Sequence, residues 1–262
     1  MRGRAAGGLL LTLPLLTALP SFSSAQFLSD LQPERPIAIE DARPIPYRAF
    51  AGSADLAYSV RRQGFDDDIG PGFSLLYGAA RGLELGAALR YVTRPNRNAL
   101  RGISSGDLEI HALYGIAAES ARLPAIAVRL GVQFPTGLDS RGTDLLLSAL
   151  LTRSFDAFRL HGNLRWTRLG DTLPSEKADR LEAALGFDFL PSPRGFTDTI
   201  LLAGVSVRSS PVVGGDTVLK AEIGARQRVG TQTILFAGIG SEAAGESDRV
   251  RLALRAGLSR VF

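Results

Sequence analysis

Residues 82–91 read GLELGAALRY, and apolar and polar side chains alternate along them. Successive side chains of an extended strand point to opposite faces, so Leu83, Leu85 and Leu89 share one face while Glu84 and Arg90 share the other. This period of two predicts a β-strand with one apolar and one charged face. How often the pattern returns decides the fold.

The same alternation returns throughout the chain. It is clear at residues 107–115, 125–134, 158–166, 180–189 and 219–228, and weaker at 48–61, 71–78, 143–153, 198–208, 232–240 and 249–262. The clear segments are about 9 to 12 residues long, which is the length of a tilted strand that crosses a bilayer. A soluble β-sandwich, the alternative, would have strands of about half that length. We therefore predict an all-β fold, a transmembrane antiparallel up-and-down β-barrel of about 12 strands.

The connections between these segments alternate in length. The first and every second one after it, such as 92–105 and 167–177, are long, whereas those between them, such as 79–82 and 229–231, are short. Outer-membrane barrels have long external loops and short periplasmic turns. An even number of strands with both ends of the chain on the short-turn side fits this rule, and we expect the protein in the bacterial outer membrane.

The start of the chain has the features of an export signal. Arg2 and Arg4 precede an apolar run from Leu9 to Leu19, and Ser23-Ser24-Ala25 is a suitable cleavage site. We expect residues 1–25 to be a cleaved signal peptide and residues 45–262 to form the barrel. Residues 26–44 are expected to form either a periplasmic segment or a plug inside the lumen.

The composition excludes several other classes of protein. The 262 residues are 45% hydrophobic and include no cysteine, which argues against a disordered chain, a disulfide scaffold, a thiolate metal site and a cysteine nucleophile. The net charge is +4, and loss of Arg2 and Arg4 with the signal leaves about +2. We therefore expect no nucleic-acid partner.

The charged side chains of the strands are predicted to point into the lumen, because an Arg or Lys facing lipid at the membrane midplane costs about 2 to 4 kcal/mol. The predicted lumen-lining residues are Glu84, Arg90, Asp107, Glu109, His111, Arg129, Arg159, His161, Arg165, Arg180, Glu182, Asp188, Lys220, Glu222, Arg226, Arg228, Arg251 and Arg255. Two interpretations stay open. The charges pair across strands and fill a narrow lumen, or the later strands form a mainly cationic wall that favours anions.

The sequence offers little for catalysis or for metal binding. His111 and His161 are the only histidines, and neither lies in a local Ser/His arrangement typical of an activated nucleophile. The run Asp66-Asp67-Asp68 lacks the spaced ligands of a calcium loop. We predict no catalytic residue, no metal site, no cofactor and no enzymatic activity.

The last strand ends at Phe262 on the apolar face. A terminal aromatic residue on an amphipathic final strand resembles the assembly signal of bacterial outer-membrane barrels. We therefore expect the barrel-assembly machinery, outer-membrane lipid and lipopolysaccharide as partners, together with a small-molecule solute.

Four stretches also resemble a known family: RPIAIEDARPIP (35–46), AVRLGVQFPTG (127–137), GTDLLLSALLTR (142–153) and LHGNLRWTRLGD (160–171). They are similar to the transporters grouped as the MetA-pathway of phenol degradation family, which are outer-membrane barrels. The resemblance spans nearly the whole mature chain and implies passage of small, including aromatic, molecules across the outer membrane. It carries no catalytic residue.

These observations lead to one expected function and one alternative. We expect an outer-membrane channel or transporter for small solutes, with aromatic or anionic compounds as candidates, that works by passive or facilitated diffusion through a charged lumen. The alternative is a closed structural barrel or a barrel enzyme that acts on lipid.

Overall fold

The computed structural model describes residues 37–61, 68–91, 106–137, 140–189, 199–245 and 250–262. These residues form twelve strands. The strands are β1 (Phe50–Arg61), β2 (Asp68–Ala80), β3 (Leu83–Arg90), β4 (Asp107–Ala117), β5 (Ala125–Phe134), β6 (Asp144–Ser154), β7 (Phe158–Arg168), β8 (Asp179–Phe189), β9 (Thr199–Arg208), β10 (Val218–Arg228), β11 (Thr233–Ala244) and β12 (Val250–Val261).

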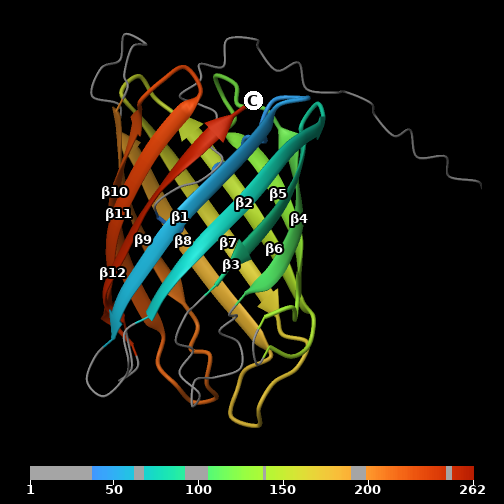
Figure 1. The fold of residues 1–262 in the computed structure, drawn as a ribbon, viewed down its shortest axis with the longest axis vertical. Coiled ribbons are helices and arrows are strands. Elements are labelled where there is room, and N and C mark those ends of the chain that lie inside the picture. Colours follow the sequence, from blue (N-terminus) through green and yellow to red (C-terminus); the bar gives the residue numbers. More distant parts are fainter. Residues whose placement is uncertain (1–36, 62–67, 92–105, 138–139, 190–198, 246–249) are drawn as a thin grey trace, which may run out of the picture.

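The strands form one closed antiparallel barrel in which each strand pairs with its neighbours in sequence and β12 pairs with β1 (Figure 1). The predicted fold and strand number are confirmed. Several strands are longer than predicted; the largest extensions are those of β2, which already begins at Asp68, and β11, which runs on to Ala244. In β2 the pairing with β1 carries the strand through Gly70-Pro71-Gly72, which in isolation reads as a turn.

The outer surface of the barrel is apolar. Along β8, for example, Leu181, Leu185 and Phe187 are exposed, whereas Gly186 and Asp188 between them are buried. Such a belt of exposed leucine, isoleucine and phenylalanine is stable in hydrocarbon and not in water. The strands therefore present their apolar face to a membrane. In the part of the chain that the structure describes, no helix is long and apolar enough to span one.

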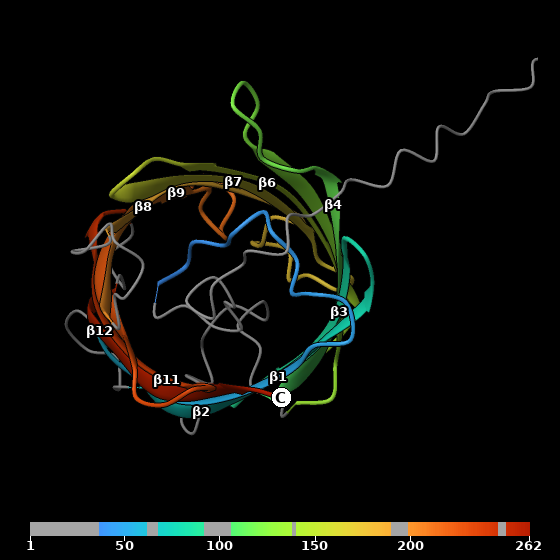
Figure 2. The same ribbon diagram turned by 90° about the horizontal axis from the view of Figure 1, so that it is seen from above.

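Residues 37–46, which we call the strap, run along the inside of the barrel before the chain enters β1 (Figure 2). Backbone N–H groups of the strap donate to side chains of the wall at 2.8 to 3.0 Å. The pairs are Ala38 to Glu222 on β10, Glu40 to Asn163 on β7, Ala42 to Thr152 on β6 and Ile45 to Glu84 on β3. The strap thus follows the inner circumference from β10 to β3. Residues 26–36 of the expected plug or periplasmic segment lie outside the described residues.

Apolar contacts hold the strap against the wall. Ile39 sits over Gly186 of β8 and Gly204 of β9, where a Cβ atom would lie only 2.3 Å and 2.1 Å from its Cδ1. Ile37 and Ile39 pack with Ile200 and Leu202, two inward side chains of β9. The alternation predicts charged side chains on the inner face. Where the strap docks, the inner face is apolar instead, because the buried isoleucines of the strap need apolar partners.

Candidate functional site in the barrel lumen

A cavity of about 490 Å³ remains inside the barrel beside the strap. Much of its wall consists of small residues, among them Gly238 and Gly240 of β11, Ala253 of β12, and Ala57 and Ser59 of β1. The free volume borders the strap itself, β10 to β12 and β1 to β5, with Arg165 of β7. Most of the predicted charged residues that line this cavity belong to two groups.

The first group joins the strap to the wall. Glu40 of the strap accepts from Arg129 of β5 at 2.8 Å and from Arg165 of β7. Arg129 also binds Glu109 of β4, and one of its nitrogens lies 3.0 Å from Nδ1 of His111. These charges neutralise one another around the strap. Neither arginine was expected to bind this segment, because pairing across the lumen leaves no local sequence signal.

The second group lies on the open wall of the cavity. Arg255 of β12 donates two hydrogen bonds of 2.8 Å to Asp55 of β1, and Arg90 of β3 lies 3.7 Å from the same carboxylate. Lys220 of β10 lies 2.6 Å from Glu222. Alternation also places Asp55 on the polar, inward face of β1, and the structure buries it there.

The bases of the later strands lie close to acids. Lys220 and Arg255 hold carboxylates, and Arg226 is almost completely buried. Arg251 is exposed at the start of β12, beside an irregularity in its pairing with β1. Charge of both signs therefore lines this side of the lumen, because acids on β1 and β10 lie beside the bases.

Three predicted lumen residues, Arg159, His161 and Asp188, form a buried network with Thr152. Thr152 Oγ1 lies 3.0 Å from His161 Nδ1, and His161 Nε2 lies 3.1 Å from Asp188, which also lies 3.5 Å from Arg159. The order Thr–His–Asp is that of an acyl-transfer triad, which sequence reasoning missed because the three residues meet only through strand register. The side chains are inaccessible to solvent, and Thr152 already accepts from Ala42. The network therefore ties the strap to the wall and offers no surface to a substrate.

The remaining predicted residues occupy inward positions. Asp107 accepts from Gly137 at 2.9 Å, Ser140 at 2.6 Å and Gln133 at 3.2 Å, so it holds the long connection after β5. Glu84 is buried, and Nε2 of His111 on the neighbouring strand β4 lies 3.9 Å from its carboxylate. Three more predicted residues point inward and are partly buried: Arg180 and Glu182 on β8 and Arg228 on β10.

Phe262 is exposed beyond the end of β12. Its N–H donates to Phe50 at 2.7 Å, and the two rings lie 5.9 Å apart. The terminal residue thus lies at the seam where the first and last strands close the barrel. Within the described ranges no group of three acidic, histidine or cysteine residues could hold a metal ion, and Asp66 and Asp67 fall outside them.

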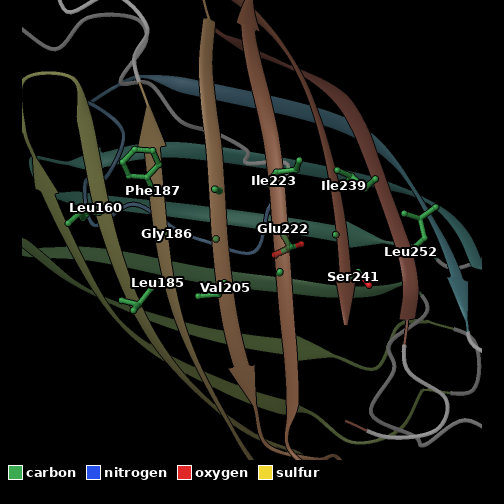
Figure 3. Close-up of a pocket in the computed structure, with 14 residues that line it drawn as sticks. Leu160, Leu185, Gly186, Phe187, Val205, Glu222, Ile223, Ile239, Ser241 and Leu252 are labelled. Atoms are coloured by element: carbon green, nitrogen blue, oxygen red, sulfur yellow. The ribbon is translucent and has the colours of Figure 1, made fainter. Parts of the chain in front are cut away.

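A second depression, of about 600 Å³, lies on the outside of the barrel across β7 to β12 (Figure 3). Outward side chains such as Leu185, Val205 and Ile223 surround it, and the small residues Ala203 and Ala221 form its floor. Most of its lining is apolar; of its polar residues, Ser241 donates its hydroxyl to the Arg251 carbonyl, and Glu222 accepts from the strap inside the barrel.

No protein-family model matches the chain, and no curated protein is similar to it in sequence. Solved structures are similar in fold. An outer membrane channel from Pseudomonas putida F1 has a TM-score of 0.66 at 14% identity, covering 86% of this chain and 100% of the channel. The NanC porin has a TM-score of 0.56 at 9% identity (79% and 98% covered), and the KdgM porin 0.54 at 11% (80% and 99%). At these identities the likeness establishes the fold, a twelve-strand barrel of the kind found in outer-membrane channels and porins.

Proposed function

We propose that the protein is an outer-membrane channel that passes small solutes by passive or facilitated diffusion through a charged lumen. The observation that carries the proposal is the cavity of about 490 Å³ that stays free beside the strap inside a closed, outwardly apolar barrel. The likeness to an outer membrane channel and to two porins supports it. A barrel of twelve strands leaves an interior between that of the filled eight-strand barrels and that of the open sixteen-strand porins.

In this proposal the inward charged side chains, from Glu84 on β3 to Arg255 on β12, line the solute path. Membrane lipid and lipopolysaccharide surround the barrel, and residues 1–25 export the chain. Phe262 serves as the signal that the barrel-assembly machinery binds, because it is exposed at the closing seam. The finer assignment to the MetA-pathway of phenol degradation family, with aromatic solutes, rests on the sequence resemblance.

A second candidate is a closed structural barrel. The observation that favours it is the strap, which runs along the inner wall and is held by ion pairs and hydrogen bonds. A lipid-modifying enzyme has weaker support, since the Thr152–His161–Asp188 network is buried. The cavity that stays free beside the strap favours the channel over both.

Electrical recording tests the proposal. The purified full chain, inserted into a planar bilayer in KCl, should give discrete conductance steps, and liposomes that contain it should swell in small neutral solutes such as glycine but not in oligosaccharides. A matched empty-detergent sample and heat-unfolded protein serve as controls. A folded barrel that inserts and gives neither steps nor swelling would favour the closed barrel.

A further inference from the structure

Ion pairs on the open side of the lumen are asymmetric in exposure. The Arg90 side chain is 49% exposed while its partner Asp55 is 3% exposed, and Lys220 is 27% exposed against 11% for Glu222. Arg208 at the end of β9 is 45% exposed, and its partner Glu242 is 8% exposed. In each pair the base is more exposed than the acid, and Arg90 and Lys220 line the cavity.

The asymmetry has a structural cause. The acids serve as acceptors for the barrel itself. Glu222 accepts the N–H of Ala38, and Glu242 accepts that of Val250 at 2.7 Å. Short carboxylate side chains that bind backbone stay near the wall, whereas the long stems of Arg and Lys carry their charge toward water.

The asymmetry is largest toward one end of the lumen. Arg90 and Arg208 are the last residues of β3 and β9, so both lie beside long connections, and Lys220 lies near the start of β10 on the same side. At the strap the difference is small and of mixed sign: Arg129 is 18% exposed against 22% for Glu109, and Arg165 is 35% exposed against 24% for Glu40. Among the described residues, the three pairs toward the long connections therefore expose their positive charge more than their negative charge.

We propose that the half of the lumen toward the long connections is a binding path for small organic anions, carboxylates above all. The inference rests on the proposed channel function and names its solute class. A carboxylate that enters meets the Arg90 guanidinium and the Lys220 ammonium before the less exposed acids. Guanidinium groups bind carboxylates through two parallel hydrogen bonds, which neutral solutes of the same size cannot form as strongly.

Reversal potentials in a KCl gradient test this path. The wild type should pass Cl⁻ more readily than K⁺. The variants Arg90→Gln and Lys220→Gln should each lower the ratio of anion to cation permeability about two- to fivefold, since a unit charge a few ångströms away changes the local concentration of an ion in water by about that factor. Each variant leaves the acid with another partner, Arg255 for Asp55 and the Ala38 N–H for Glu222.

Arg168→Gln is the matched control. Arg168 also ends a strand, β7, its side chain is 52% exposed and it pairs with Asp179, but it lies on the outer face beside Trp166. Removing this charge should leave the permeability ratio unchanged. Benzoate should also reduce the KCl current at concentrations at which benzamide does not, and Arg90→Gln should weaken that block.

The outcomes separate the two proposals. A folded wild type without conductance overturns the channel function. A conducting wild type with no anion preference overturns the anion path alone, as does an equal shift in the Arg168→Gln control or equal block by benzoate and benzamide.

Discussion

Replacing Ile39 by alanine should release the N-terminal end of the strap from the barrel wall. Ile39 is buried between Gly186 and Gly204, and it packs with Ile200 and Leu202. Truncation of a buried isoleucine to alanine costs about 2 to 5 kcal/mol in a packed core. The pairing of the twelve strands does not depend on this side chain. The lost free energy therefore weakens the docking of the strap and not the barrel. At 1.4 kcal/mol per factor of ten, the opening equilibrium should rise at least about 25-fold.

The chain contains no cysteine, so a single introduced thiol reports on the strap. Ile37 is buried in the same cluster as Ile39. In an Ile37→Cys background, Ile39→Ala should raise the rate of labelling by a water-soluble maleimide at least about tenfold. Ile223→Ala is the control, because Ile223 is an exposed isoleucine on the outer face of β10. Equal labelling rates in the Ile39→Ala and Ile223→Ala proteins would refute the role of Ile39 as an anchor.

Three further substitutions test the facing, the assembly and the buried network. Leu130→Arg, on the lipid face, should lower the free energy of unfolding in vesicles by about 2 to 4 kcal/mol, whereas Gln133→Arg should be far milder because it points inward beside an acid; equal losses would contradict the assigned facing. Deleting Phe262 should reduce the folded barrel in the outer membrane while export continues, and unchanged levels would argue against an assembly signal. Thr152→Val removes the buried hydroxyl that bonds His161, and should cost about 1 to 3 kcal/mol in denaturant unfolding; an unchanged midpoint would show that the network does not stabilise the protein.

The fold was predictable because the alternation of side chains is a local property of strands. In β3 the exposed Leu85 and the buried Glu84 follow the pattern of their sequence, and the same holds along β8 and β12. Strand bounds were predicted less well at β2, where pairing with β1 outweighs the turn propensity of Gly70-Pro71-Gly72. Local propensity decides a strand end only where no neighbouring strand competes with it.

The sequence predicts which residues of the candidate site point into the lumen, but not which residues they contact there. That Arg129, Arg165 and Lys220 point inward follows from alternation. That Arg129 and Arg165 meet at Glu40 does not, because Glu40 belongs to the strap, far from both arginines in sequence. The pairing of bases on the later strands is unpredictable for the same reason, since Asp55 contacts Arg255 from a strand 200 residues away in sequence.

The sequence by itself determined the number of strands, the facing of their side chains and the alternation of long and short connections. Each of these depends on residues close together in the chain and on whether a side chain meets lipid or not. The tertiary structure alone decided the path of the strap, the buried Thr152–His161–Asp188 network and the exposure of bases over acids. These depend on barrel closure and strand register, which bring together groups as far apart as Ala38 and Glu222, 184 positions along the chain. A pattern with a period of two residues carries no information over such a separation.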